Sequence, residues 1–468
     1  MRADILVIGG GASGLMAAYA AASALVSSGA AAQVTVLEKM PRVARKIMIS
    51  GKGRCNFTNV KAWNEFSGHI RSKPNFVRSA FHALPPEALV SFFEGFGMKG
   101  VVERGDRAFP ASHRSSDVVD TLVSACHGAG VKIECSSEVS SVERSGDGFR
   151  VLLSDGREYL CPRLIVATGG LSYPGTGSTG DGYRWAAELG HRITPTFPSL
   201  TALVPKGYKD YDGKDLHIDR STPLGEYGRM LCGIQLKNVG LSLVIEGTVA
   251  DSDFGDVDFT DGGLEGPLGF RVSRKAVKSL LNGSRVSLVL DLKGAVPLTE
   301  LTLRIKELWK EVDTDPRSAR LREKEKCRIM LGKLMPWELI PAFVHAHPEI
   351  YTLERRGRRD TKLWVNLVSI AKALKEWRFD IAGFVGYERA VVTAGGVSCD
   401  DCISKTMESR LVKGLYFCGE LLDIDGDTGG YNLQLAFCTG SLAGESAARS
   451  LLASPAGTEE ALTATPEP

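Results

Sequence analysis

The sequence has almost no excess charge of either sign. Its 468 residues include 57 basic and 55 acidic side chains, which give a formal net charge of +2. A chain with so little net charge has no overall field that would draw it to nucleic acid or to an anionic membrane. The composition therefore gives no indication of a nucleic-acid partner, and none of the oligomeric state.

Long apolar runs are missing as well. Only four residues precede Ile5, and the first apolar run is already broken at Gly9, so we expect no secretory signal. The longest weakly polar stretch, residues 12–37, is interrupted by serines, a glycine and Gln33. We therefore expect no transmembrane span.

Cysteine and histidine are too scattered for a disulfide scaffold or a metal site. The ten cysteines are spread over the chain, which favours a reducing, cytoplasmic location. Cys399 and Cys402 have no predicted helix N-terminus that would lower a thiol pKa, so we do not predict thiol chemistry there. No metal site is predicted, because the following histidines form no constellation with neighbouring cysteines or acids: His113, His191, His345 and His347.

The most informative stretch is at the beginning of the chain. Residues 5–8 form a short β-branched and apolar run, typical of a strand buried in a parallel sheet. Gly9, Gly11 and Gly14 follow at the G-x-G-x-x-G spacing. In this motif the first glycine permits a tight turn, the second lets a pyrophosphate approach the backbone, and the third lets the helix pack closely on the strand.

A helix and a second strand complete this pattern. The alanine-rich, proline-free residues 13–28 predict a helix whose free N-terminal amides face a phosphate. The predicted strand 33–37 ends at Glu38. A carboxylate there accepts the ribose hydroxyls and repels a 2′-phosphate, which indicates FAD or NAD rather than NADP. A glycine turn that binds nothing would leave this combination unexplained.

Two further glycine-rich segments follow. Residues 46–56 combine cations, glycines and an asparagine, which suits a pyrophosphate and the polar edge of a redox ring, although a plain surface loop is the alternative. Residues 175–180 repeat the G-x-G-x-x-G spacing, but residues 171–174 separate them from the preceding strand and Asp181 delays the next helix. We interpret this segment as an active-site loop rather than a second dinucleotide site.

The character of the sequence changes near residue 194 and again near 389. Residues 195–297 contain short predicted strands and turns that indicate a β-barrel or sandwich, and residues 298–347 are charged and predicted to be helical. Alternating signs in 317–326 favour a solvated helix face over a nucleic-acid patch. The arginines of 355–359 could hold an anionic substrate or the phosphates of NAD(P)H, but a solvated surface is the favoured interpretation.

The α/β character returns at residue 391. A predicted strand, 415–418, ends in Gly419 and Glu420, and glycines at 429–430 open an alanine-rich helix that extends to about residue 450. A helix N-terminus in this position can stabilise negative charge at N1 and O2 of a reduced flavin.

Together these motifs resemble the two-dinucleotide-fold flavoproteins and, more narrowly, the bacterial BaiN/YhiN-like NAD(P)/FAD-dependent oxidoreductases. The resemblance spans the chain and rests on residues 9–14, 46–56, 167–182, 393–397 and 419–432. It implies an α/β fold with a discontinuous Rossmann-like FAD-binding domain, an inserted β-barrel and a helical subdomain. The resulting boundaries are 1–194 and 389–452 for the FAD-binding domain, 195–297 for the barrel, 298–350 for the helical subdomain, 351–388 for the return, and 453–468 for a disordered tail.

The resemblance also implies which residues hold FAD. Lys52 departs from it, because a small residue is expected there; a cation at this position could bias the site towards an anionic substrate or a reduced flavin. The candidate cofactor-binding residues are Gly9, Gly11, Ala12, Ser13, Gly14, Glu38, Lys39, Lys46, Ser50, Gly51, Gly53, Arg54, Cys55, Asn56, Val139, Ala167, Thr168, Gly169, Gly419, Glu420, Gly430, Tyr431, Asn432 and Leu433.

The predicted activity is that of an FAD-dependent oxidoreductase. We expect a reductase that takes hydride from NAD(P)H, as a transient co-substrate, and delivers it to an activated alkene or carbonyl compound; one branch of the family is similar to reductases of unsaturated 3-oxo bile acids. The alternatives are an oxidase or dehydrogenase that uses oxygen or a quinone, and a flavin-containing protein that binds nucleic acid or another anionic partner. Candidate proton donors or substrate anchors are Arg54, Cys55, Tyr173 and Tyr431.

Overall fold

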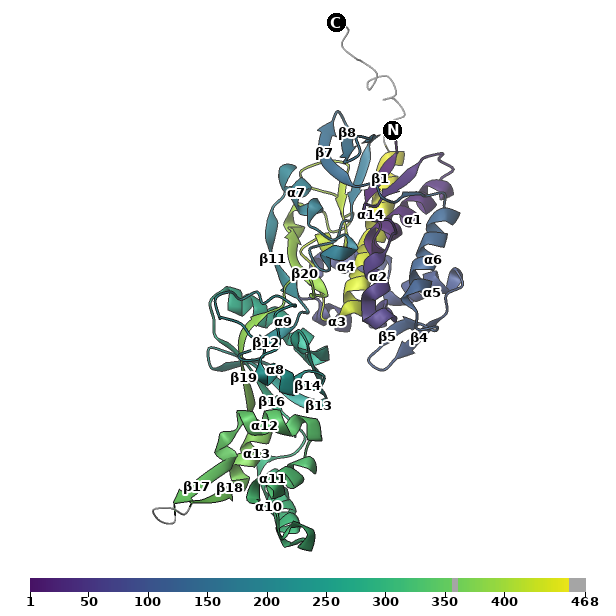
Figure 1. The fold of residues 1–468 in the computed structure, drawn as a ribbon. Coiled ribbons are helices and arrows are strands. Elements are labelled where there is room, and N and C mark those ends of the chain that lie inside the picture. The colour runs from purple at the N-terminus through teal and green to yellow at the C-terminus, as the bar shows by residue number, and fades with distance from the viewer. Residues whose placement is uncertain (356–360, 454–468) are drawn as a thin grey trace. The chain divides into compact units, whose positions relative to one another are not determined.

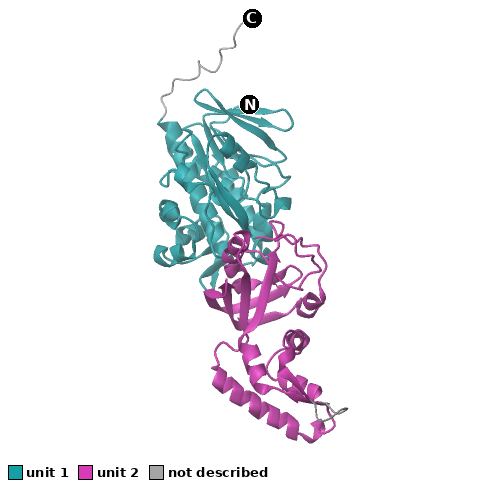
Figure 2. Ribbon diagram, turned by 90° about the vertical axis from the view of Figure 1, so that its left-hand side faces the viewer, with its two compact units in different colours: residues 1–198, 391–468 teal, residues 199–390 magenta. Residues whose placement is uncertain are grey.

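The computed structural model describes residues 1–355 and 361–453. The chain divides into two compact units (Figure 2). The first unit is built from residues 1–198 and from the chain after residue 390, and the second is the segment Ser199–Ala390. Both ends of the chain therefore contribute to the first unit.

A five-stranded parallel sheet forms the centre of the first unit (Figure 1). Its strand order is β21-β10-β1-β2-β6, and the first strand in the sequence, β1, lies in the middle with β10 and β2 on either side. Every residue of β1, β2 and β10 is buried, as expected for strands covered on both faces. The bounds are β1 (Ile5–Ile8), β2 (Val34–Leu37), β6 (Lys132–Glu134), β10 (Arg163–Val166) and β21 (Leu415–Phe417).

Smaller sheets and helices surround this parallel sheet. The sequence predicts a hairpin here, because Asp155-Gly156-Arg157 lies between the β-prone runs 151–153 and 159–161. The two strands on either side of Gly156 pair antiparallel, which confirms this prediction. The other strands are β3 (Thr58–Asn59), β4 (Gly100–Glu103), β5 (Arg107–Pro110), β7 (Val139–Ser145), β8 (Gly148–Leu153), β9 (Glu158–Cys161), β11 (Ile193–Ser199) and β20 (Val392–Val397). The helices are α1 (Ala12–Ser27), α2 (Arg45–Ile49), α3 (Trp63–Phe66), α4 (Pro74–Ala83), α5 (Pro86–Gly95), α6 (Ser115–Gly128), α7 (Asp181–Glu188) and α14 (Gly429–Leu452).

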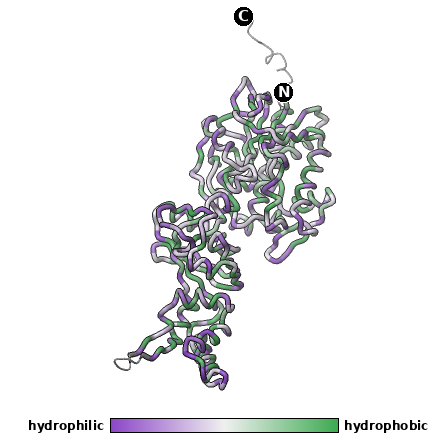
Figure 3. The backbone as a smooth tube through the Cα atoms, viewed as in Figure 1, coloured by the Kyte–Doolittle hydropathy of each residue, from purple (hydrophilic) through white to green (hydrophobic). Residues whose placement is uncertain are grey.

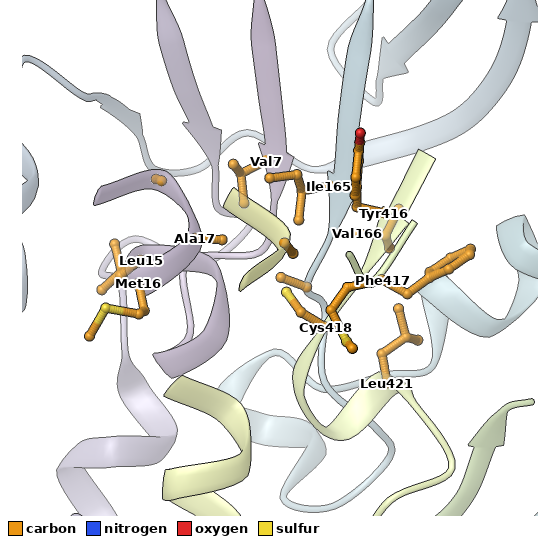
Figure 4. Packing of buried hydrophobic residues seen from close by; sticks show 14 of the residues in the cluster. Val7, Leu15, Met16, Ala17, Ile165, Val166, Tyr416, Phe417, Cys418 and Leu421 are labelled. Atoms are coloured by element: carbon orange, nitrogen blue, oxygen red, sulfur yellow. The ribbon is translucent and has the colours of Figure 1, made fainter. Parts of the chain in front are cut away.

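The core of this unit lies between the parallel sheet and the helices packed on it. Figure 4 shows Val7 of β1 and Ile165 of β10 beside Ala17 of α1, and all three are fully buried. Phe417 and Cys418, at the end of β21, close the same cluster and are also buried. The cluster fixes the carboxyl ends of the strands, where the glycine turn begins.

Helices α1 and α14 cross at a contact made of small residues. A Cβ atom on Gly440 would overlap the carbonyl oxygen of Ser13, and one on Gly444 would overlap the carbonyl oxygen of Ala17. The two helix backbones therefore touch directly at these positions. This contact joins the first helix of the chain to the last.

The second unit contains a closed six-stranded barrel in the order β12-β15-β14-β13-β16-β19. Residues 241–245 and 286–290 are two of the short strands that the sequence predicts within 195–297, and they pair antiparallel in the barrel, with Leu241 opposite Leu290. Of the two predicted architectures, a barrel or a sandwich, the structure thus has the barrel. The bounds are β12 (Leu203–Pro205), β13 (Gln235–Ile245), β14 (Thr248–Thr260), β15 (Gly263–Glu265), β16 (Val286–Asp291) and β19 (Trp377–Phe384), with helices α8 (Glu226–Leu231) and α9 (Gly266–Leu281).

A helical region with one hairpin completes the second unit. The predicted helical stretch is divided into separate helices, and the first of them ends at Thr314, shortly before Pro316. Arg317, Arg322 and Lys326 each form an ion pair with an acidic neighbour, which supports the solvated-face interpretation. The elements are α10 (Leu298–Thr314), α11 (Glu323–Gly332), α12 (Ile340–Ala346) and α13 (Leu367–Lys375), with the hairpin β17 (Tyr351–Arg355) and β18 (Thr361–Val365).

No helix in the described part of the chain is long and apolar enough to cross a membrane. Figure 3 shows hydrophilic and hydrophobic residues mixed along the tube in both units. Two earlier expectations fall on residues outside the described ranges: the tip of the arginine cluster at 356–359 and the tail from 454 to 468.

Candidate functional site

All of the predicted site residues lie in the first unit, and the glycine turn after β1 is the centre of their arrangement. Gly9 has a φ of +104°, and a Cβ atom there would lie 2.5 Å from the carbonyl oxygen of Ala167. A Cβ atom on Gly14 would overlap the carbonyl oxygen of Gly9. Both positions therefore require glycine, because the turn is pressed between strand β10 and the first turn of α1.

Gly11 differs from the other two glycines of the motif. It is the N-cap of α1, its φ of −82° suits any residue, and no side chain caps the helix here. A Cβ atom on Gly11 would have no heavy atom within 4 Å. The open space in front of the uncapped amides of residues 12–14, which include the predicted Ala12 and Ser13, is suited to an anionic group such as a pyrophosphate.

Glu38 follows β2 and lies beside this turn. Its Oε2 accepts a hydrogen bond from the Gly10 amide and its Oε1 accepts one from the Met40 amide, both at 2.8 Å. Burial raises the pKa of Glu38 above its ordinary value, and the two amide hydrogen bonds oppose that rise. Each carboxylate oxygen keeps a second lone pair with which it can accept a ribose hydroxyl.

Replacing Glu38 with glutamine should weaken FAD binding about tenfold. The side-chain NH2 group of glutamine would point at the backbone amide of Gly10 or of Met40, and two hydrogen-bond donors cannot pair. In the cofactor-free protein the raised pKa means that the protonated carboxyl favours folding. This stabilisation is fully present below the unfolded value near 4.5 and is lost as pH rises through the folded pKa. Because glutamine does not titrate, the stability of Glu38→Gln should not fall with pH in this way.

The measurements are FAD titration and thermal unfolding of the cofactor-free protein across pH, with the exposed Glu143→Gln as the matched control. Unchanged FAD affinity in Glu38→Gln would contradict the proposed role of this carboxylate.

The second glycine-rich pattern lies next to Glu38. Lys39 forms an ion pair with Asp181 at 2.7 Å and donates a hydrogen bond to Thr179. A Cβ atom on Gly177 would lie 2.9 Å from the Met40 side chain and 3.7 Å from Glu38 Oε1. This part of the loop therefore closes the ribose end of the candidate site. Helix α7 begins at Asp181, directly after the glycine pattern and with Gly180 as its N-cap, so the expectation that Asp181 delays this helix is wrong.

Other predicted residues lie at the two ends of the site. The backbone amide of Ser137 donates to the carbonyl oxygen of Glu38 at 2.9 Å, and the buried Val139 begins β7 two residues later.

Thr168, after β10, has a buried hydroxyl with no hydrogen-bond partner among the described residues. An unpartnered hydroxyl beside the glycine turn is the kind of group that a bound cofactor satisfies. The neighbouring Gly169 has a φ of +71°.

The loop that follows α2 has an unusual backbone. Gly51, Lys52, Gly53 and Cys55 all have positive φ angles. For the two residues other than glycine this conformation costs roughly 1–2 kcal/mol each. Lys52 is exposed and occupies a left-handed position that a glycine would adopt without strain, which accounts for the expectation of a small residue there. Strain of this kind is typical of ligand-binding loops.

The side chains of this loop have distinct surroundings. Arg54 forms an ion pair with Glu103 and lies 2.9 Å from His113 Nδ1, with its guanidinium over the Phe109 ring. Cys55 is fully buried, and burial raises the pKa of its thiol to about 12. The Ser50 hydroxyl donates to the carbonyl oxygen of Ile47. The Cys55 thiol thus stays protonated and away from solvent at neutral pH.

Thr393, the second residue of β20, forms hydrogen bonds with the segments that follow β10 and β21. The sequence analysis did not include this threonine among the site residues. The Thr393 hydroxyl accepts the amides of Leu171 and Ser172, and its own amide donates to Glu420 Oε1 at 2.9 Å. Glu420 Oε2 accepts from Lys46 at 2.7 Å. Thr393 opens a glycine motif noted in the sequence, and that motif was the available signal.

The loop before α14 is held by hydrogen bonds from a residue in the first turn of that helix. The Asn432 side chain accepts the Gly426 amide and donates to the carbonyl oxygens of Gly426 and Thr428. A Cβ atom on Gly430 would overlap the side chains of Asn56 and Asn59, so this helix start is packed against the earlier loop. Tyr431 is buried, Leu433 is partly buried, and a Cβ atom on Gly419 would overlap the Ser13 hydroxyl of α1.

These features fit a bound FAD. The turn at residues 9–14 offers space and free amides for a pyrophosphate, and Glu38 offers acceptors for a ribose. Thr168 offers a hydroxyl that has no hydrogen-bond partner among the described residues. The start of α14 offers a second set of backbone amides. Within the described ranges no group of three histidine, cysteine, aspartate or glutamate side chains could hold a metal ion. Cys399 and Cys402 are buried free thiols whose pKa values are raised by burial.

Sequence comparison extends over almost the whole chain. Residues 3–446 match the family described as HI0933-like protein Rossmann domain. The chain is 31% identical over 445 residues to the 3-dehydro-bile acid delta(4,6)-reductase of Clostridium scindens, covering 94% of this chain and 98% of the relative.

Two further relatives have a different activity. The chain is 30% identical over 438 residues to the ribosomal RNA dihydrouridine synthases of Haemophilus influenzae and of Escherichia coli. These matches cover 92% and 93% of this chain and 95% and 96% of the relatives. The chain therefore belongs to the HI0933-like family of FAD-dependent oxidoreductases.

Proposed function

We propose that this protein is an FAD-dependent reductase of an alkene conjugated to a carbonyl group, with NADH or NADPH as the hydride donor. The activities of the relatives share this chemistry. A bile acid with a 3-oxo group and Δ4,6 unsaturation carries an alkene conjugated to its carbonyl, and uridine becomes dihydrouridine by saturation of the ring alkene conjugated to a carbonyl. The same addition of hydride and proton serves both.

The observation that carries this proposal is the open glycine turn at Gly11 combined with Glu38. When bound, FAD supplies hydride storage and transfer. We assign the amides of residues 11–14 to the pyrophosphate, Glu38 to the ribose, and the start of α14 to the electron-rich edge of the reduced ring. Lys46 forms an ion pair with Glu420 at 2.7 Å, so this pair adds no net charge to the site. Arg54 and Tyr173 remain the candidate substrate anchors.

A small molecule is the first candidate substrate. The chain has a net charge of +2, and several cations of the helical region are already neutralised by acids. A uridine in ribosomal RNA is the second candidate, favoured by the two relatives of 30% identity that match over nearly their whole length. Binding to RNA through phosphates would weaken steeply as salt is raised, whereas binding of a steroid acid would not.

Under anaerobic conditions we expect either NADH or NADPH to bleach the flavin absorbance of the purified protein promptly. Adding a 3-oxo-4,6-diene bile acid, or in a parallel sample unmodified ribosomal RNA, should restore the oxidised spectrum, and mass spectrometry should find two added hydrogen atoms in the acceptor. A flavin that neither nucleotide reduces would contradict the reductase. The alternative, an oxidase or dehydrogenase with oxygen or a quinone as acceptor, would then be tested with candidate electron donors.

A further inference from the structure

Two short segments that are far apart in the sequence pair beside the start of α14. Ile70 forms an antiparallel bridge with Gly426, and the Asp427 amide donates to the carbonyl oxygen of His69 at 3.0 Å. The Arg71 amide donates to the carbonyl oxygen of Asp425 at 2.8 Å. This pairing fixes the backbone of His69 against the loop that leads into α14.

The His69 imidazole is held on two sides. Its Nδ1 lies 2.9 Å from Asp427 Oδ2, and Arg71 donates to both oxygens of the same carboxylate. The ring stacks on Tyr431 with 4.4 Å between centroids and an angle of 18°. Asp427 is therefore an anchored acceptor, and it fixes the tautomer in which Nδ1 carries a proton.

The other ring nitrogen is left available. Nε2 of His69 has no hydrogen-bond partner among the described residues, and 38% of the side chain is exposed. Asp427, by contrast, has only 8% of its side chain exposed. The arrangement therefore presents one imidazole nitrogen to solvent, while the carboxylate that holds the ring stays buried.

Position relates this imidazole to the candidate flavin site. Asp427 immediately precedes Thr428, the N-cap of α14, and Tyr431 lies in the first turn of that helix. We have assigned this helix start to the electron-rich edge of the reduced ring. His69, stacked on Tyr431, thus lies at the border of that site.

Three of the four other candidate groups, all but Tyr173, are less suited to donating a proton. The Cys55 thiol is fully buried, with its pKa raised to about 12, and Tyr431 is buried, with its pKa raised by burial. Arg54 is an arginine and stays charged in proteins. Histidine is the side chain whose ordinary pKa lies close to neutral pH.

We propose that His69 is the acid that protonates the substrate, and that Asp427 and Arg71 are the positioning residues that hold it; this rests on the proposed function. When the β-carbon accepts a hydride, the electron pair of the alkene moves towards the α-carbon and the carbonyl. The Nε2–H bond of the imidazolium then breaks and a C–H bond forms at the α-carbon. The neutral imidazole, still bonded to Asp427 through Nδ1–H, regains its proton from solvent.

The test uses the holoenzyme reduced in advance and mixed without oxygen with the acceptor that wild type uses, a 3-oxo-4,6-diene bile acid or unmodified ribosomal RNA. His69→Gln should slow reoxidation about a hundredfold, within the usual range for a general acid. FAD content and the rate of reduction by NAD(P)H should stay unchanged. His127→Gln, an exposed histidine on α6, is the matched control.

Two readouts separate an acid from a structural residue. The reoxidation rate measured across pH should have a different profile in His69→Gln than in wild type, because only wild type has an imidazole at this position. Nitrogen-15 NMR of the histidine rings should show His69 protonated at Nδ1 at high pH, and Asp427→Asn should shift this tautomer. The groups facing the ring are Asp427, Arg71 and Tyr431.

Several results would overturn the assignment. Equal reoxidation rates in His69→Gln and wild type would do so, and so would loss of FAD from the variant, which would make the role structural. A large loss in Tyr173→Phe with none in His69→Gln would move the acid to Tyr173. If wild type itself reduces neither acceptor, the proposed function fails first and the assignment fails with it.

Discussion

Replacing Gly11 with aspartate should almost abolish FAD binding without destabilising the cofactor-free protein. Gly11 is the N-cap of α1, with extended backbone angles and open space around its Cα. Aspartate is a preferred N-cap residue, and its carboxylate would accept the same amides that we assign to the pyrophosphate. Losing two charge-assisted hydrogen bonds costs about 4 kcal/mol, which is about a thousandfold in Kd.

The charge and the size of the new side chain can be separated. Gly11→Asn caps the helix equally well but carries no charge, so it should weaken FAD binding less than Gly11→Asp. The measurements are FAD titration and the thermal unfolding of the cofactor-free forms. Gly14→Ala is the contrasting variant, because its Cβ atom would overlap the carbonyl oxygen of Gly9 and should destabilise even the cofactor-free protein. Full FAD occupancy in Gly11→Asp would contradict the placement of the pyrophosphate.

The sequence was most informative where structure is determined by neighbouring residues. The strand, the glycine turn and the helix at residues 5–28 depend on local patterns, and the structure has β1 and α1 in those positions. The hairpin around Gly156 depends on a two-strand pattern with a turn between, and its pairing is confirmed. In the barrel, Leu241 and Leu290 are buried and lie opposite each other, but the short strands and turns seen in the sequence did not distinguish a barrel from a sandwich.

The candidate site depends also on contacts that no local pattern reveals. Lys46 and Glu420 are 374 residues apart in the sequence, and His69 and Asp427 are 358 apart. Neither pair has a spacing that predicts contact, because the fold alone brings the two ends of the chain together. Thr393 is similar: its hydroxyl accepts amides from residues more than two hundred positions earlier. Residues of this kind need the topology before their roles can be assigned.

Substitution at the junction between the two ends of the chain should also affect stability. Gly444 lies inside α14, where intrinsic helix propensity predicts that alanine is more stable than glycine by about 1 kcal/mol. The structure predicts the opposite, because the new Cβ atom would overlap the carbonyl oxygen of Ala17 in α1. The obstacle is backbone within a packed helix, which cannot rotate away as a side chain can. We therefore expect Gly444→Ala to lower the free energy of unfolding by roughly 2–3 kcal/mol.

Gly128, at the end of α6, is the matched control, since a Cβ atom there would have no heavy atom within 4 Å. Gly128→Ala should leave stability unchanged or raise it slightly. Urea unfolding of both variants tests the comparison, and a stabilised Gly444→Ala would show that the helices do not touch as closely as described. The glycine turn lies at the start of α1, and the second set of amides lies at the start of α14. If Gly444→Ala moves the two helices apart, it should therefore weaken FAD binding as well as lower stability. A variant that loses stability but binds FAD with wild-type affinity would mean that the two helix starts hold the cofactor independently.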